Sequence, residues 1–340
     1  MLAPIYIAEL SPPAHRGKLV SFNLFAIFLG QSAAFYSNFF LRNFGGSDNW
    51  RWMLGVMVVP SFLLFVSLLF VPESPRWLVE RHRDEPAIRI LTRINGTAEA
   101  DREFKAIAES VQNEDEGKLS ECFHHGMFGL LMIGIMLAVF QQVTGINVVM
   151  YYAPRIFQAM GYATAAQMWF TAAVGLTNVL ATFIAIAYVD RWGRKPILYA
   201  GFAVMAVGLG VVGTLMHLGI TTEGEQVLAV VMLLIFIVGF AMSAGPLVWT
   251  LCSEIQPLKG RDFGIGASTL TNWVVNWVVG NTFLTLLNTF GRAQTFWLYA
   301  VLNASFLLFT YALVPETKGV TLEQIERKLM SGARLRDIGR

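Results

Sequence analysis

The chain has 340 residues, of which 55% are hydrophobic and 14% are charged, and its formal net charge is +2. Soluble domains carry about 25% charged residues, so this composition predicts a membrane protein. The small net charge argues against nucleic acid as a partner, and the two cysteines, Cys122 and Cys252, do not indicate a disulfide framework.

Eight stretches of the chain are free of Asp, Glu, Lys and Arg and reach the roughly 20 residues that a membrane-spanning helix needs. They are Leu19–Leu41, Met53–Val71, Met127–Tyr152, Thr164–Val189, Pro196–Met216, Gln226–Ser253, Phe263–Gly291 and Ala293–Val314. The first residues, Met1–Ala8, are typical of the last part of another span. The sequence therefore predicts an all-α membrane protein with eight full transmembrane helices and the end of a ninth.

Basic residues divide unequally between the two ends of the predicted spans. One side holds 21 Lys and Arg residues, whereas the other holds 4. The richer side comprises the connections Ser11–Lys18, Pro72–Gly126, Asp190–Lys195 and Glu254–Asp262 and the tail from Pro315. Because cytoplasmic connections carry the excess of Lys and Arg, the long loop and the tail are predicted to be cytoplasmic.

The long loop divides the chain into parts. Apolar residues recur at helical spacing in two of its segments, Ala87 to Ile94 and Phe104 to Val111, which predicts short amphipathic helices under the membrane helices. The alternative is a flexible linker. We expect a remnant of an amino-terminal helix bundle at 1–71, a cytoplasmic linker at 72–126, a carboxyl-terminal six-helix bundle at 127–314 and a cytoplasmic tail at 315–340.

Two motifs occur once in each half of the chain. Glu9 precedes Arg16 by seven residues, as Glu254 precedes Arg261, and Val71-Pro72-Glu73 is repeated as Val314-Pro315-Glu316. Such repeats predict two homologous halves that arose by parallel duplication. The first half lacks counterparts to about three spans of the second, so we expect an amino-terminally truncated twelve-span protein. A native nine-span protein is the alternative.

Several motifs together resemble those of the sugar porter family of the major facilitator superfamily. They are Pro72-Glu73-Ser74-Pro75-Arg76-Trp77, the segment Phe140–Tyr152, Asp190-Arg191-Trp192-Gly193-Arg194-Lys195 and Pro315-Glu316-Thr317-Lys318-Gly319. Within that family, Ala241–Pro246 and Cys252–Gly264 are most similar to bacterial galactose–proton symporters, with arabinose–proton symporters next. The resemblance covers essentially the whole chain.

This resemblance implies a transport protein rather than an enzyme. It implies a monomeric carrier in the bacterial inner membrane that moves a monosaccharide, galactose or a related hexose or pentose, by alternating access. The proton is then the coupling ion, with no cofactor, and the partners are the sugar and the lipid bilayer. The alternatives are facilitated diffusion without a proton and a sugar sensor that does not transport.

The span Met127–Tyr152 contains neutral polar side chains that lipid does not tolerate, because a buried polar group without a partner costs several kcal/mol. They are Gln141, Gln142, Asn147 and Tyr151. Such groups must face protein, water or a ligand, and a row of them suits a ligand covered in hydroxyls. An unbroken helix would splay the amides, but Thr144-Gly145 is a point where it can bend or unwind.

The resemblance implies that Gln141, Gln142 and Asn147 contact the sugar and that Tyr151 lies near the outer gate. The alternative is hydrogen bonding between helices, which is common for amides in membranes.

Two further candidates lie in later spans. Trp249 follows Gly245-Pro246, where the proline bends the helix, and its flat face can cover the apolar side of a sugar ring. The resemblance places Asn272 on the sugar, with Trp273 and Asn276 as its neighbours. The alternative for Trp249 is packing or contact with lipid.

Asn178 and Gln31 complete the set of candidate sugar ligands. Asn178 is a polar residue in the middle of its span. Members of the resembled family usually carry a glutamine where this chain has Leu24. Gln31 lies two helical turns further on, on the same helix face, and we expect it to replace that amide in part.

Ten charged residues of the family motifs lie at the inner ends of spans. They are Glu9, Arg16, Glu73, Arg76, Asp190, Arg191, Arg194, Glu254, Arg261 and Glu316. The resemblance implies gating salt bridges that hold the inner side closed in the outward-facing state. The alternative is ordinary anchoring at the level of the lipid headgroups.

Proton coupling needs a titratable group within the membrane, yet the eight predicted spans contain neither Asp nor Glu. The resemblance places the coupling aspartate in a first span that this chain lacks. Either that segment holds the coupling residue or the chain does not couple. The sequence also contains no pattern typical of a nucleophile–base pair, a metal cluster or a phosphate loop.

Overall fold

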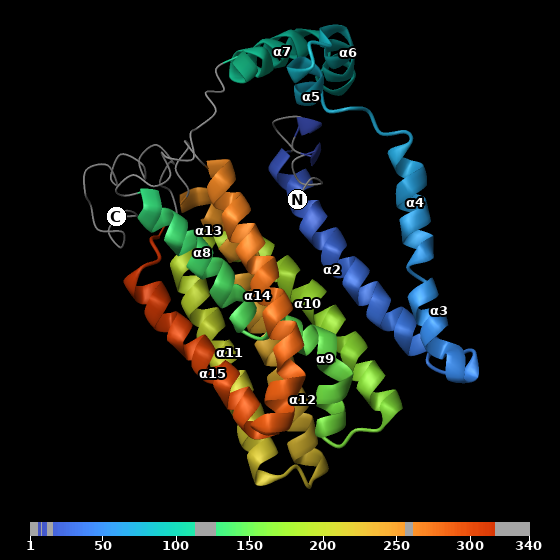
Figure 1. Cartoon of the computed structure of the whole chain (residues 1–340), viewed down its shortest axis with the longest axis vertical. Coiled ribbons are helices and arrows are strands. Elements are labelled where there is room, and N and C mark those ends of the chain that lie inside the picture. The colour runs from blue at the N-terminus through green and yellow to red at the C-terminus, as the bar shows by residue number, and fades with distance from the viewer. Residues whose placement is uncertain (1–5, 8, 12–15, 113–126, 256–260, 317–340) are drawn as a thin grey trace. The chain divides into compact units, whose positions relative to one another are not determined.

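The computed structural model describes residues 6–7, 9–11, 16–112, 127–255 and 261–316. Every regular element in these ranges is a helix, which confirms the predicted all-α class (Figure 1). The chain divides into two compact units, Met1–Gly117 and Lys118–Arg340, and each is considered by itself.

The first unit contains an apolar helical hairpin. It consists of α2 (Arg16–Leu41), the 3-10 turn η1 (Gly46–Asp48), α3 (Asn49–Gly55) and α4 (Val58–Leu68). The Asn49 side chain donates a hydrogen bond to the carbonyl of Arg42 at 2.7 Å, and the rings of Phe44 and Trp52 meet edge to face. These contacts fold the chain back at the tip of the hairpin.

The returning arm of this hairpin, Gly46–Leu68, is long and apolar enough to cross a membrane. Within the described first unit, no residue of its most apolar segment is buried, and Phe62 and Phe65 are 63% and 62% exposed. Apolar surface of this extent is expected to face lipid or other protein rather than water.

Three short helices follow in the long loop. They are α5 (Pro75–Glu80), α6 (Asp84–Asn95) and α7 (Thr97–Gln112). Ser74 caps α5 by accepting a hydrogen bond from the backbone of Trp77, and Pro75 occupies the first helical position, where its missing N–H costs nothing. The apolar faces of the three helices meet in a small core around Leu78 and Ala87.

The described residues of the second unit form six passes, two of which are broken. The helices are α8 (Met127–Val143), α9 (Ile146–Ala159), α10 (Thr164–Trp192), α11 (Arg194–Leu218), α12 (Glu223–Met242), α13 (Ala244–Ile255), α14 (Arg261–Thr289) and α15 (Arg292–Ala312). One pass comprises α8 and α9, and another comprises α12 and α13. The helix α11 packs along α15 and α12, whereas α14 packs against α8 (Figure 1).

The close approach of α11 to α12 depends on a glycine. A Cβ on Gly201 would lie 1.9 Å from Oγ of Ser243 and 2.8 Å from the carbonyl oxygen of Gly239. Only a residue without a side chain allows the two backbones to pack this closely at that level.

Six segments of the described chain are long and apolar enough to span a membrane. They are Gly46–Leu68, Phe128–Ala159, Thr164–Ile184, Arg194–Leu218, Glu223–Cys252 and Arg292–Ala312. The other two predicted spans correspond to α2 and α14, whose 26 and 29 residues suffice in length. The described part of α2 includes the apolar segment Phe25–Leu41, whereas α14 is less apolar than the six segments above. In α14 the amides of Asn272, Asn276 and Asn281 lower the hydropathy.

Candidate functional site

The predicted weak point at Thr144-Gly145 is a break in the helix, because α8 ends at Val143 and α9 begins at Ile146. Gly145 has a φ angle of 89°, a left-handed conformation that favours glycine. The Thr144 hydroxyl donates a hydrogen bond to the carbonyl of Gln141 at 2.6 Å, which satisfies one of the carbonyls at the end of α8.

Four amide side chains form a directed chain of hydrogen bonds around this break. Asn147 Nδ2 donates to Gln142 Oε1 at 2.6 Å, and Gln142 Nε2 donates to Asn272 Oδ1 at 2.8 Å. Asn272 Nδ2 then donates to Gln141 Oε1 at 2.7 Å. Gln141 Nε2 ends the chain on the carbonyl oxygen of Ala244 at 2.9 Å, where α13 begins.

This chain of amides joins α8, α9, α13 and α14. Gln141, Gln142 and Asn272 are at most 6% exposed, so their polar atoms depend on one another in the absence of a ligand. Four of the predicted sugar ligands thus lie together in the structure. They are joined by hydrogen bonds between helices, which the sequence-based prediction gave as the alternative to ligand contact. The two interpretations are compatible, because a hydroxyl both donates and accepts and can replace a bond in such a chain.

A pocket of about 390 Å³ lies between α9 and α14. It is lined by Tyr151, Tyr152, Trp273, Asn276, Trp277, Gly280 and Asn281. Two aromatic residues of α14 flank its polar groups, an arrangement that suits a ligand with hydroxyls on an apolar ring.

Asn276 is one of the polar residues that line this pocket. It is 7% exposed and its Nδ2 donates to the hydroxyl of Tyr151 at 3.2 Å. Within the described part of the chain, its Oδ1 is buried and accepts no hydrogen bond. A buried acceptor without a partner is unfavourable, so a small movement that exposes it to a donor of a ligand would be stabilising.

Sequence reasoning named Asn276 and Trp273 only as neighbours of Asn272, and it missed Trp277 and Asn281. The sequence did contain a signal, because these residues are spaced four apart along one helix. Asn272 and Asn276 share one face of α14, and Trp273 and Trp277 share a neighbouring face.

Three further predicted ligands lie on α13, α2 and α10. Trp249 is half-buried on α13, in the turn after Pro246, and Gln31 is half-buried on α2 in the first unit. Asn178 is 2% exposed on α10, and among the described residues its Oδ1 has no hydrogen-bond partner. The side chain of Leu24 lies outside the described residues.

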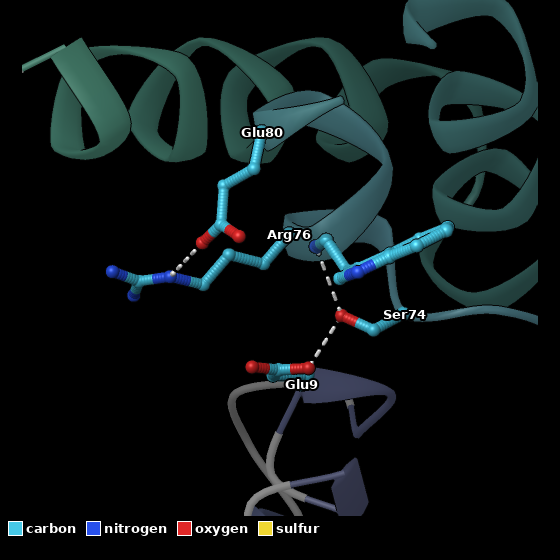
Figure 2. Close-up of polar contacts among 5 residues, drawn as sticks. Glu9, Ser74, Arg76 and Glu80 are labelled. Carbon is cyan, nitrogen blue, oxygen red and sulfur yellow. Dashed lines mark hydrogen bonds and ion pairs between the residues drawn. The ribbon is translucent and has the colours of Figure 1, made fainter. Parts of the chain in front are cut away.

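The first group of charged motif residues lies in the first unit (Figure 2). Glu9 accepts a hydrogen bond from the Ser74 hydroxyl at 2.5 Å. Arg76 pairs with Glu80 at 3.7 Å within α5, and Glu73 pairs with Arg83 at 3.4 Å. These two ion pairs are largely exposed, and pairs of that kind contribute little stability individually.

In the second unit, the Glu316 carboxylate joins the start of α11 to the segment that follows α15. It accepts hydrogen bonds from the backbone N–H groups of Arg194 and Lys195, at 3.0 and 2.9 Å, at the positive end of α11. The Lys195 ammonium donates to the carbonyls of Tyr311 and Val314 near the end of α15. The start of α11 is thereby fixed to the end of α15.

The other predicted gating residues have side chains outside the described residues. They are Arg16, Asp190, Arg191, Glu254 and Arg261. In the ranges that the structure does describe, no group of three or more His, Cys, Asp or Glu side chains is placed to hold a metal ion.

Known sequences provide an independent comparison. A family model described as "Sugar (and other) transporter" matches residues 1–329. The galactose-proton symporter of Escherichia coli K12 is 54% identical over 343 residues, which cover 99% of this chain and 72% of that protein. The arabinose-proton symporter of the same strain is 48% identical over 342 residues, again with 99% and 72% coverage.

Solved structures give the same result. The inward open conformation of the xylose transporter XylE from E. coli matches with a TM-score of 0.83 and 36% identity, covering 96% of this chain and 68% of that chain. A structure of the proton:xylose symporter XylE bound to 6-bromo-6-deoxy-D-glucose, described as a major facilitator superfamily protein, matches with a TM-score of 0.74 and 38% identity, covering 96% and 70%. The predicted major facilitator fold is therefore confirmed.

Proposed function

The chain belongs to the sugar transporter family, and from this premise we propose that it carries a monosaccharide across a membrane together with a proton. Galactose is the first candidate, followed by arabinose and xylose, since the relatives are symporters of these sugars. The observation that carries the proposal is the chain of four amides at a break in an apolar helix, beside an aromatic pocket.

Each part of this site has a separate role in the proposal. Gln141, Gln142, Asn147 and Asn272 bind sugar hydroxyls by exchanging their mutual hydrogen bonds for bonds to the ligand. Tyr151 and the free acceptor of Asn276 extend the polar surface along α9 and α14. Trp249 covers the apolar face of the ring, and Asn178 and Gln31 contribute further contacts as the site closes.

The charged motifs act at the inner ends of the helices. We assign them to the closed inner gate, with the Glu316 cap on α11 as a fixed point that joins α11 to α15. The excess of basic residues supports a cytoplasmic position for the linker and the tail, at a bacterial inner membrane. Alternating access then moves the closed gate from one side of the sugar to the other.

Facilitated diffusion is the second candidate, and one observation favours it. The eight apolar stretches contain no carboxylate that could take up a proton within the membrane. A chain without such a group would let the sugar equilibrate without moving protons.

The experiment that separates these functions uses the full-length protein reconstituted into liposomes. Labelled galactose uptake and external pH are recorded together after galactose is added. Uptake with alkalinisation of the medium is the expected result. Uptake without a pH change replaces symport by facilitated diffusion, binding without uptake identifies a sensor, and neither binding nor uptake contradicts the proposal for this sugar.

The site itself is tested by Gln142→Ala. Two partners in the amide chain, Asn147 and Asn272, then lose a hydrogen bond. We expect galactose affinity to fall about tenfold, because the bound sugar loses its bonds to Gln142 and an unpaired buried polar group costs about 1–3 kcal/mol. Gln158→Ala is the matched control, since Gln158 is an exposed amide on α9 that bonds only Arg155 among the described residues. Equal affinities in both variants would remove Gln142 from the site.

A further inference from the structure

Asn303 is a buried amide of α15 that reaches the break between α8 and α9. It is 0% exposed, and its Nδ2 donates to the carbonyl oxygen of Thr144 at 3.0 Å. The same Nδ2 donates to the carbonyl of Tyr299, one turn earlier on α15, at 2.8 Å. Both hydrogens of this side-chain amide are therefore directed to backbone carbonyls, one of them at the break.

The break creates the need for such a donor. Thr144 lies outside both helices, so its carbonyl has no place in the hydrogen-bond ladder of α8 or of α9. A buried carbonyl without a partner costs several kcal/mol in an apolar surrounding. Asn303 supplies the hydrogen bond that makes a broken helix acceptable at this depth.

Other residues of α15 hold the same segment. The Tyr299 ring lies so close to Gly145 that a Cβ there would be 2.9 Å from Cδ1 of the ring. Below the break, Phe140 packs against Phe306 with ring centroids 4.6 Å apart. The amides Gln141 and Gln142 contact α13 and α14 instead, so α15 supports the break from a different side than the candidate ligands occupy.

We propose that Asn303 is a positioning residue for the sugar site, which it serves by fixing the geometry of the break. Gln142 and Asn147 lie on opposite sides of Gly145, and their bond of 2.6 Å depends on the angle between α8 and α9. Without the Asn303 donor, Gly145 can relax and carry Asn147 away from Gln142. The part of this proposal that concerns sugar affinity rests on the function proposed above.

The bonding of Asn303 predicts a chemical signature. Among the described residues, its Oδ1 accepts no hydrogen bond, so only the donor group is in use. A side chain of the same shape that cannot donate should lose the function, and one that regains a donor should recover it.

The first test compares Asn303→Leu with Thr310→Val in the full chain in detergent. Thr310 is also 0% exposed on α15, and within the described ranges its hydroxyl has no partner, so its loss should be harmless. Hydrogen–deuterium exchange is measured without sugar on peptides that cover residues 140–150. We expect faster exchange there in Asn303→Leu alone. Unchanged exchange in that variant overturns the positioning role, whatever the sugar results are.

The second test measures galactose affinity in the same variants. Asn303→Leu should weaken binding about tenfold, which corresponds to 1.4 kcal/mol, while Thr310→Val should not change it. If exchange rises but affinity stays the same, Asn303 stabilises the break without positioning the ligands and the proposal is wrong. If the unmodified chain binds no galactose while exchange still rises in Asn303→Leu, the proposed function fails and the role of Asn303 at the break stands.

Asn303→Asp adds a readout that a general packing defect would not produce. Its carboxyl group keeps the shape of the amide and can donate only when protonated. Exchange protection and affinity, each relative to the unmodified chain, should therefore recover as the pH is lowered. A defect that does not depend on pH would contradict the need for a donor.

Discussion

The two broken passes of the second unit are held open in different ways. At Thr144-Gly145 the local bond of the Thr144 hydroxyl is joined by contacts from a distant helix, through Asn303 and Tyr299 of α15. At Ser243, between α12 and α13, the supporting contacts are local or steric. The Ser243 hydroxyl donates to the carbonyl of Gly239 at 2.6 Å, and Gly201 of α11 packs directly against it.

This difference shows how the proposed ligand site can combine two kinds of support. The break at Ser243 is held by backbone packing, and the break at Thr144-Gly145 is held by side chains of another helix. The second break contributes backbone carbonyls, those of Ala244 and Gly245, to the amide chain, and tight packing of α11 and α12 holds it in place. The first break carries Gln142 and Asn147 on its two sides, and α15 supports it through the Asn303 donor and the Tyr299 ring. The first break therefore depends on side chains of another helix, whereas the second depends on the close packing of two backbones.

Gly201→Ala should have the largest effect, because it disturbs the packing of α11 against the break at Ser243. The new Cβ would collide with the backbone carbonyl of Gly239, which cannot move aside cheaply, and overpacking of this kind costs about 1–3 kcal/mol. Gly210→Ala on the same helix is the control, since its nearest neighbour would be 3.9 Å away. Thermal midpoints in detergent should fall for Gly201→Ala only, and equal midpoints would contradict this packing argument.

Asn272→Leu should come next, because it removes a middle member of the amide chain. Gln142 Nε2 and Gln141 Oε1 would each lose their partner, a sugar hydroxyl would lose the bond that we propose to Asn272, and galactose affinity should fall about tenfold. Thr282→Val is the control on α14, since the Thr282 hydroxyl bonds the carbonyl of Val278 in its own helix. Isothermal titration with galactose measures both variants. An unaltered affinity in Asn272→Leu would show that the amide chain is only structural.

Ser243→Ala should have the smallest effect and sharpens the contrast most directly. It removes one hydrogen bond within a helix end, worth about 1 kcal/mol or less. Galactose affinity should stay within about twofold of the unmodified chain, as measured by the same titration. A loss as large as the one expected for Asn303→Leu would mean that the two breaks do not differ as described.

Much of the helical architecture followed from hydrophobic length alone, and one break followed from Thr144-Gly145. Pro246 was expected to bend a continuous helix. It lies instead in the first turn of α13, where a missing N–H costs no hydrogen bond, and the break precedes it at Ser243. A proline or a glycine in the sequence indicates that a helix is interrupted nearby. It does not indicate whether the interruption comes before or after that residue.

The amides of the site could be named from the sequence, but their partners could not. Gln142 and Asn272 are 130 positions apart, and no local pattern joins them. Asn303 was missed altogether, because its partner is a backbone carbonyl that becomes available only when the helix breaks. A side chain that bonds a backbone carbonyl freed by a helix break leaves no periodic signal in the sequence.

The chain of amides has a direction, which runs from Asn147 through Gln142 and Asn272 to Gln141. A group that enters between two members must accept a hydrogen from one and give a hydrogen to the next. A hydroxyl does both at a single atom, whereas a fluorine or an ether oxygen can only accept. The chain of amides therefore favours an inserted group that both donates and accepts a hydrogen bond. A deoxy or fluoro substitution at the inserted position leaves at least one amide unpaired.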